Sequence, residues 1–348
     1  MPEPRPGLRE LVPYRAPQPD VEVRLNTNEC PYALPEGFAE ELAGAIRAIP
    51  FNRYPDRDAT ALRRALSAHT GHREETVWAA NGSNEIIEQL LLAYGGPGRN
   101  VVLFEPTYVL HGQIARTVHS DVVTLDVPAP FVIGGRHVRA ALDARPAVVF
   151  VCSPNNPTGN AQPLEAVEDL AASTEALVVV DEAYIEFGGK SASDLVASYP
   201  NLVVVRTFSK AFALAAARIG YCIADPEVIE DLERVRLPYH LSALTQAAGL
   251  VALRYTREAM SILDAVRRER DRMFTALSTM AGIETYPSDA NFVLFRPSRP
   301  GPDVWRSLLE RGVLVRDMST VVPECLRVTA GTTEEVDRFL DALHEALG

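Results

Sequence analysis

The stretch Leu177-Val-Val-Val-Asp181 and the run Leu202-Val-Val-Val-Arg-Thr207 that follows it decide the fold. Both are apolar at nearly every position, whereas a strand with one solvent-facing side alternates apolar and polar residues. Further short runs share this character, and helical patterns separate several of them: Val77–Ala80, Val101–Phe104, Val122–Leu125, Ala147–Cys152 and Gly220–Ala224. Strands of this kind, alternating with helices, are typical of parallel sheets. The sequence predicts an α/β fold with a mostly parallel central sheet flanked by helices.

The pattern changes after about residue 240. Two long helical segments, Leu241–Tyr255 and Thr256–Met280, precede shorter strand candidates and a closing helix that begins at Thr333. We expect a large domain over residues 31–240 and a smaller α+β domain over residues 241–348. Residues 1–30 are rich in proline and lack periodicity, so we expect an extended N-terminal arm that joins the small domain.

Composition excludes several classes of protein. The 348 residues include 46 acidic and 34 basic ones, and a formal charge of -12 disfavours nucleic acid as a partner. The four cysteines form no C-x-x-C pair, so we expect reduced thiols rather than disulfides or a metal site. No run approaches the roughly 20 apolar residues of a membrane span. We expect a cytoplasmic protein with no membrane partner.

Polar residues follow several of the apolar runs, at the edge of the sheet where ligands bind in parallel folds. Asn81-Gly-Ser-Asn84 precedes a helical pattern, which fits either a phosphate on a helix N-terminus or an ordinary capped turn. Ser153-Pro-Asn-Asn-Pro-Thr-Gly159 offers two amides that could hold a polar ring substituent, although turn formation alone also explains it. Both segments are therefore candidate ligand contacts.

The next two runs end in charged residues. Asp181 is costly to bury unless a cation or several donors meet it, and a helix N-cap is the alternative. Lys210 and Arg218 are candidates for covalent work on a carbonyl and for anion binding, unless the lysine lies on the surface. One ligand with a phosphate, a basic ring nitrogen and a carbonyl would suit all these strand ends. We predict pyridoxal 5'-phosphate as the cofactor.

Three segments resemble the signatures of fold type I pyridoxal-phosphate aminotransferases: Ser153–Gly159, Asp181-Glu-Ala-Tyr184, and Thr207–Leu214 with Arg218–Tyr221. Other segments resemble, in order along nearly the whole chain, those of the histidinol-phosphate aminotransferases: Val23–Glu29, Arg53–Asp56, Ala80–Glu85, Leu237–Ser242, Ser288–Phe295 and Leu326–Gly331. The resemblance implies an enzyme of histidine biosynthesis with an amino donor and a keto acid as substrates. It would convert histidinol phosphate and 2-oxoglutarate into imidazole-acetol phosphate and glutamate.

The resemblance also implies roles for individual residues. Lys210 would form a Schiff base with the cofactor and carry protons, and Asp181 would keep the pyridine nitrogen protonated. Asn156 and Tyr184 would hydrogen-bond the ring hydroxyl. The remaining cofactor contacts would come from Gly82, Ser83, Asn84, Tyr108, Ser209 and Arg218.

Other implied contacts concern the substrate and a second subunit. Arg327 would hold the carboxylate or phosphate of the substrate, with Arg316 as a second candidate. Tyr14 and Asn28 would close over the site, unless the arm only packs on its own domain. Tyr54 would reach the cofactor phosphate of the neighbouring subunit in a homodimer. The chain departs from many relatives in two places. Ala215-Ala-Ala217 stands where they have a glycine–leucine pair before Arg218, and the added methyl groups could shift this loop. Asn28-Glu-Cys-Pro31 has the small Cys30 where relatives usually have asparagine or tyrosine, which could alter the edge of the pocket.

Three other functions stay open on the sequence. An aromatic amino-acid aminotransferase would need a pocket that differs by only a few contacts. A decarboxylase of a phosphorylated amino acid would use the same cofactor to break a different bond at the same carbon. A regulator that binds pyridoxal phosphate without turnover is the third alternative.

Overall fold

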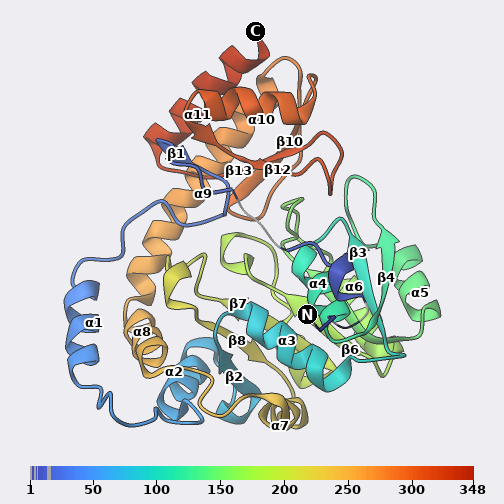
Figure 1. The fold of residues 1–348 in the computed structure, drawn as a ribbon, viewed down its shortest axis with the longest axis vertical. Helices are drawn as coiled ribbons and strands as arrows, with labels where there is room; N and C mark the ends of the chain where they lie inside the picture. Colours follow the sequence, from blue (N-terminus) through green and yellow to red (C-terminus); the bar gives the residue numbers. More distant parts are fainter. Residues whose placement is uncertain (1, 4, 6, 14–16) are drawn as a thin grey trace.

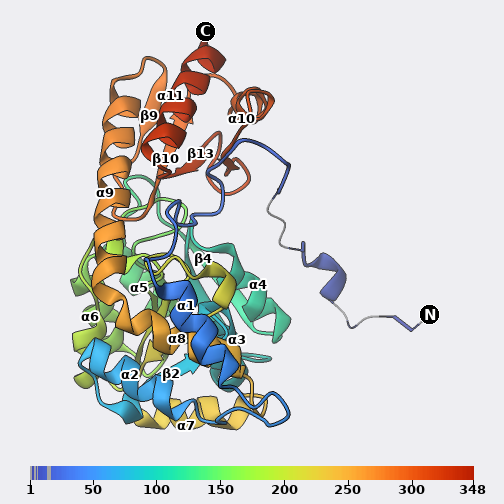
Figure 2. The same ribbon diagram turned by 90° about the vertical axis from the view of Figure 1, so that its left-hand side faces the viewer.

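The computed structural model describes residues 2–3, 5, 7–13 and 17–348. Figure 1 shows a larger part built around a central sheet and a smaller part at the C-terminal end of the chain. Helix α9 (Thr256–Thr279) runs from one part to the other along the side of the molecule, as Figure 2 shows.

The larger part contains a seven-stranded sheet in the order β2-β8-β7-β6-β5-β3-β4. Its strands are β2 (Val77–Ala80), β3 (Asn100–Glu105), β4 (Asp121–Asp126), β5 (Pro146–Cys152), β6 (Leu177–Asp181), β7 (Leu202–Thr207) and β8 (Gly220–Ile223). β8 pairs antiparallel with β2 and β7, and the other pairs are parallel. The predicted mostly parallel sheet is confirmed, with one antiparallel strand inside it.

Helices cover both faces of this sheet, which explains the continuous apolar runs. On β6, Val178 and Val180 belong to one buried cluster and Val179 to the other. Helices α3 (Ser83–Tyr94), α4 (Val109–Thr117) and α7 (Pro226–Val235) pack on the Val179 side. The opposite side is covered by α2 (Thr60–Thr70), α5 (Gly135–Asp143), α6 (Leu164–Ser173) and α8 (Ala243–Arg254), with α1 (Phe38–Arg47) beside α8. Because both faces of the sheet are buried, the positions of β6 before its terminal Asp181 are all apolar.

The smaller part contains a four-stranded antiparallel sheet in the order β12-β13-β10-β9. Its elements are β9 (Ile283–Thr285), β10 (Phe292–Pro297), α10 (Gly301–Glu310), β12 (Arg316–Asp317), β13 (Leu326–Thr329) and α11 (Thr333–Leu347). β1 (Val23–Arg24) pairs with β11 (Val313–Leu314), so the N-terminal segment lies against this part (Figure 1). The domain boundaries at residues 30 and 240 stay a prediction.

Short 3-10 helices complete the described structure: η1 (Leu8–Glu10), η2 (Glu74–Thr76), η3 (Ile185–Phe187), η4 (Ser193–Ala197) and η5 (Ala215–Ala217). In the part of the chain that the structure describes, no helix combines the length and the apolar character that crossing a membrane requires.

Candidate functional site

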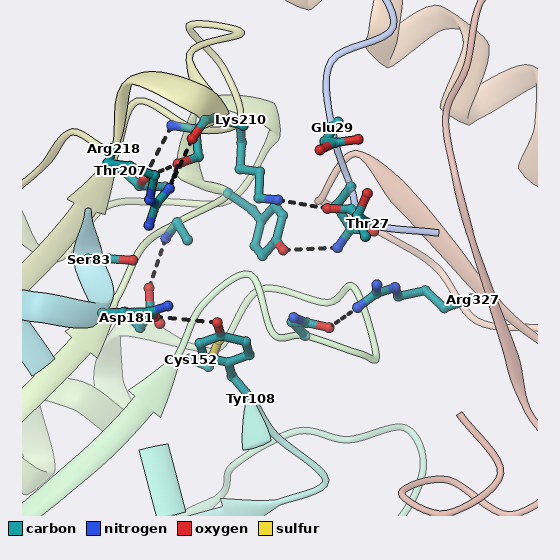
Figure 3. A pocket seen from close by; sticks show the side chains of 17 residues that line it. Thr27, Glu29, Ser83, Tyr108, Cys152, Asp181, Thr207, Lys210, Arg218 and Arg327 are labelled. Carbon is teal, nitrogen blue, oxygen red and sulfur yellow. Dashed lines mark hydrogen bonds between the residues drawn. The ribbon is translucent and has the colours of Figure 1, made fainter. Parts of the chain in front are cut away.

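A cavity of about 180 Å³ lies at the carboxyl ends of β5, β6 and β7, where Cys152, Asp181 and Thr207 are the last strand residues. Most of the predicted site residues line it: Asn28, Ser83, Asn84, Tyr108, Asn156, Asp181, Tyr184, Ser209, Lys210, Arg218 and Arg327. Ala215, of the alanine run before Arg218, lines it as well, together with residues to which the sequence analysis gave no contact: Thr27, Glu29, Cys152, Ala183 and Thr207. In Figure 3, Lys210 points into the space between Arg218 and Arg327.

Lys210 is partly buried and its amine faces the cavity. Its Nζ donates a hydrogen bond to the backbone oxygen of Thr27 at 2.9 Å. Burial and the nearby positive charges of Arg327 and Arg218 lower the pKa of Lys210 to about 8, against the opposing effect of Glu29. A substantial fraction of this amine is therefore neutral near neutral pH, as a nucleophile toward a carbonyl must be.

We expect the rate of Schiff-base formation between the apo-protein and pyridoxal phosphate to rise with pH up to about 8 and then level off. The neutral amine is the nucleophile, and its population increases as the pH rises through the pKa and saturates above it. Stopped-flow absorbance after mixing measures this rate. A rate that keeps rising toward about pH 10 would show a lysine of ordinary pKa.

Asp181 is 2% exposed and receives two hydrogen bonds. Its Oδ1 accepts from the backbone N–H of Ala183 at 3.1 Å, and its Oδ2 lies 3.0 Å from Nε2 of His111. The next helix, η3, begins only at Ile185 and its N-cap is Tyr184, so Asp181 caps no helix. Lone pairs remain on both carboxylate oxygens, so either oxygen can accept a further hydrogen bond from a ligand.

His111 is a partner of Asp181 that sequence reasoning missed. The ring is fully buried and stacks on Phe150 with ring centroids 4.6 Å apart. Its Nδ1 has no hydrogen-bond partner among the described residues, so the proton of a neutral ring belongs on Nε2, facing Asp181. His111 therefore donates a hydrogen bond to the carboxylate of Asp181 and orients it. The sequence signal that could have revealed His111 is its position one helical turn after Tyr108, a predicted cofactor contact.

The N-terminus of α3 and the guanidinium of Arg218 form one end of the cavity. The N-cap Gly82 has φ 83 and ψ 167, a conformation that is almost restricted to glycine. A Cβ at Gly82 would lie 2.5 Å from Nη2 of Arg218, so only glycine leaves room for this approach. Arg218 donates to Oγ of Ser209 at 3.2 Å and to the backbone oxygen of Ala215 at 3.1 Å. The helix N-terminus, hydroxyl groups and guanidinium together fit a phosphate.

Two polar side chains, Tyr184 and Asn156, line the middle of the cavity. Oη of Tyr184 accepts a hydrogen bond from Nδ2 of Asn28 at 2.9 Å, and Oδ1 of Asn156 accepts from Nη1 of Arg327. Burial raises the pKa of Tyr184 to about 12, so its hydroxyl keeps its proton. Tyr108 also lines the cavity and donates to Oδ1 of Asn84 at 3.3 Å. These groups could contact a ring and its hydroxyl.

The smaller part of the molecule contributes two arginines, which lie on neighbouring strands. Arg327 of β13 is 7% exposed, and its Nη2 donates to the backbone oxygen of Asn26 at 2.9 Å. Arg316 of β12 pairs directly with Arg327, which puts both side chains on the same face of the sheet. Arg316 lines an adjoining cavity of about 570 Å³, whose lining shares Tyr108, Asn156 and Arg327 with the first. Arg327 thus borders both cavities, and Arg316 lines the second.

Three of the predicted contacts that the structure describes, Tyr54, Gly82 and Arg316, are not among the residues that line this cavity, although Gly82 directly precedes Ser83 and Arg316 lines the adjoining cavity. Tyr54 is 79% exposed and stacks on Tyr239 with ring centroids 4.4 Å apart, away from the cavity of its own chain. Tyr14 lies outside the described residues. Within the described ranges, no group of histidine, cysteine and acidic side chains is arranged to hold a metal ion.

Comparisons with known proteins point to one family. The family described as aminotransferase class I and II matches residues 20–343. A histidinol-phosphate aminotransferase of Thermobifida fusca is 49% identical over 352 residues, covering 99% of this chain and 95% of that protein. One of Frankia casuarinae is 48% identical over 359 residues, covering 99% and 90%. The crystal structure of the Sinorhizobium meliloti histidinol-phosphate aminotransferase with pyridoxal-5'-phosphate has the same fold, with a TM-score of 0.89 at 22% identity over 99% of this chain and 97% of that one.

Proposed function

Since the chain belongs to the class I and II aminotransferases and, within them, to the histidinol-phosphate aminotransferases, we propose that it transfers the amino group of histidinol phosphate to 2-oxoglutarate. The products are imidazole-acetol phosphate and glutamate, and the reaction serves histidine biosynthesis. One observation carries the proposal: a single cavity combines Lys210, the buried Asp181, and a cation at each end, Arg218 and Arg327.

The cavity fits pyridoxal 5'-phosphate, the cofactor of this family. Arg218 and the N-terminus of α3 would hold the phosphate together, because the missing side chain of Gly82 lets the guanidinium of Arg218 lie close to this helix end. Asp181 would meet the ring nitrogen, and Tyr184 and Asn156 the ring hydroxyl. When bound, the cofactor supplies a carbonyl for Schiff-base formation and a ring that takes up the electron pair of a broken C–H bond.

The side chains of this protein do the rest of the chemistry. Nζ of Lys210 takes the proton from the substrate carbon that carries the amine and returns a proton on the cofactor side. The carboxylate of Asp181, oriented by His111, holds a proton on the ring nitrogen and so favours electron uptake by the ring. Because Lys210 and Asp181 line the same small cavity, they can act on one bound substrate.

The paired arginines favour histidinol phosphate over an aromatic amino acid. Phosphate carries nearly two negative charges near neutral pH, whereas the carboxylate of phenylalanine carries one. Arg316 and Arg327 present two guanidinium groups on one face of the small sheet, which suits a dianion better than a single carboxylate. An aromatic amino acid needs only one of these cations.

We expect Arg316→Gln to raise the KM for histidinol phosphate about tenfold or more, with little change in kcat. The phosphate does not react, so losing one of its charge-assisted contacts weakens the ground state and the transition state alike. Steady-state glutamate formation measures both constants, with Arg306→Gln on the exposed face of α10 as the matched control. An unchanged KM, or an equal rise in the KM for phenylalanine, would contradict a phosphate contact.

We also propose a cytoplasmic homodimer in which Tyr54 reaches the partner's cavity. Tyr54 is 79% exposed, and Phe51, three residues before it, is 67% exposed. Leu237, two residues before Tyr239, is 76% exposed. Large exposed apolar and aromatic side chains of this kind are typical of protein interfaces. The cysteines Cys30, Cys152, Cys222 and Cys325 are unpaired, which fits the reducing cytoplasm.

Mixed dimers test the contribution of Tyr54. We expect Tyr54→Ala to weaken pyridoxal phosphate binding about tenfold, because a hydroxyl contact to a charged phosphate is lost. In a dimer that pairs a Tyr54→Ala chain with a Lys210→Ala chain, one of the two sites should regain full affinity, since its lysine and its tyrosine come from different chains. Co-expression with two affinity tags isolates this dimer. If neither site recovers, Tyr54 acts within its own chain or not at all.

A further inference from the structure

A buried chain of hydrogen bonds joins Thr329 of β13 to Tyr184 in the cavity. Asn28 lies between them, and all three residues are buried. The backbone N–H of Asn28 donates to Oγ1 of Thr329 at 3.0 Å, and Oγ1 lies 3.1 Å from Oδ1 of Asn28. Nδ2 of Asn28 then donates to Oη of Tyr184 at 2.9 Å. Thr329 thus contacts the cavity only through Asn28.

This chain has a fixed direction. The Thr329 hydroxyl accepts from the backbone of Asn28, and its single proton goes to Oδ1 of Asn28. If the amide were flipped, its NH2 group would face the hydroxyl, and within the described structure the Thr329 proton would have no acceptor. Nδ2 therefore faces Tyr184, whose oxygen accepts. The proton of the Tyr184 hydroxyl must then point elsewhere, and Tyr184 lines the cavity.

We propose that Thr329 is a positioning residue which, through Asn28, keeps the Tyr184 hydroxyl proton directed into the cavity toward the ring oxygen of the cofactor. In this way it sets how firmly the linkage between Lys210 and the cofactor holds its proton. The inference rests on the proposed function, because it requires a bound pyridoxal phosphate.

Two further contacts keep the middle of the chain in place. Nδ2 of Asn291 donates to the backbone oxygen of Asn28 at 3.1 Å, and Asn28 has φ 56, in the left-handed region. Thr329 stands two residues after Arg327 on β13, so both side chains lie on the same face of this strand. The strand that carries the substrate-binding arginine thereby also carries the residue that orients Tyr184.

The charged groups around the linkage are separate from this chain. Tyr184 is influenced by Arg327, Asp181 and Cys152, and the ammonium of Lys210 lies 5.9 Å from its ring centroid. Lys210 is influenced by Arg327, Arg218 and Glu29. The hydroxyl of Thr329 bonds only to Asn28 within the described structure. Replacing Thr329 by valine therefore removes the hydroxyl without removing any of these charges.

The direction of the effect follows from where the shared proton lies. A donor to the ring oxygen stabilises negative charge there and weakens the hold of the oxygen on the proton that it shares with the Lys210 nitrogen. When the Tyr184 hydroxyl no longer donates to the ring oxygen, the linkage between Lys210 and the cofactor keeps its proton to higher pH. We expect Thr329→Val to raise the pH midpoint of the visible absorbance of the holoenzyme by about half a unit to one unit. Tyr184→Phe should raise it at least as much.

Spectrophotometric pH titration of the holoenzyme, without substrate, tests the proposal. Thr329→Ser should keep the wild-type midpoint because it keeps the hydroxyl. Thr285→Val, on β9 of the same sheet with a bond to Ser278, is the matched control and should also keep it. In a Tyr184→Phe background, Thr329→Val should add no further shift.

A wild-type midpoint in Thr329→Val would overturn the proposal, as would a shift that persists undiminished in the Tyr184→Phe background. If Thr329→Val does not fold, Asn28→Gly tests the same connection, because glycine accepts φ 56 and lacks the amide. Asn28→Gly should raise the pH midpoint when Tyr184 is present and should leave it unchanged in the Tyr184→Phe background. A protein that binds no pyridoxal phosphate would instead contradict the proposed function itself.

Discussion

Replacing Lys210 by alanine should lower kcat by at least about 10⁴-fold and remove the absorbance band of the Schiff base between Lys210 and the cofactor. The Lys210 amine is the only one that lines the described cavity. In the proposed reaction it is both the covalent anchor and the group that moves the proton at the substrate carbon. Neither task has a substitute nearby, because the other cationic side chains of the lining, Arg218 and Arg327, carry guanidinium groups rather than amines.

The chain offers a matched control for this experiment. Its sequence contains two lysines, Lys190 and Lys210, and Lys190 is exposed. Lys190→Ala should keep wild-type turnover and absorbance. Borohydride reduction of the holoenzyme should attach the cofactor to Lys210, as peptide mass mapping would reveal. Attachment to Lys190, or substantial glutamate formation by Lys210→Ala, would contradict the assignment.

Asp181→Asn should lower kcat by about 10² to 10³-fold while pyridoxal phosphate still binds. The amide can accept a hydrogen bond from His111 but cannot hold a proton on the ring nitrogen, so the ring becomes a poorer acceptor of electrons. Binding should survive because the phosphate contacts at the N-terminus of α3 and at Arg218 do not involve Asp181.

Asp126→Asn is the matched control for this variant. Asp126 also ends a strand of the central sheet, β4, but it is exposed and lies outside the cavity lining. Its substitution should leave kcat unchanged. Steady-state kinetics together with the absorbance of the bound cofactor separate turnover from binding. If Asp181→Asn kept nearly wild-type kcat, the carboxylate would not be the partner of the ring nitrogen.

The central sheet was predictable because burial on both faces leaves a local signal. Val178, Val179 and Val180 of β6 are all buried, and no solvent-facing position interrupts them. The direction of β8 left no such signal, since an antiparallel strand buried on both faces has the same local composition as a parallel one. Strand direction depends on the connections between elements, which a short apolar run does not contain.

The cavity lining was predictable where its side chains lie at or shortly after the end of a strand, as Asp181 and Lys210 do. Contacts made by the backbone were not predictable. Lys210 donates a hydrogen bond to the backbone oxygen of Thr27, and every residue type carries such an oxygen, so the side chain of Thr27 gives no signal of the contact. His111 and Asp181 lie 70 residues apart in sequence, and Asn28 and Thr329 lie 301 apart. Only the folded chain brings these partners together.

The comparison of kcat/KM for histidinol phosphate and for phenylalanine, with 2-oxoglutarate as acceptor, tests the proposed substrate. Glutamate formation by the purified holoenzyme measures both values under the same conditions. The paired arginines predict a preference for histidinol phosphate of about 10²-fold or more. Equal values for the two substrates, or no glutamate from histidinol phosphate, would contradict the account.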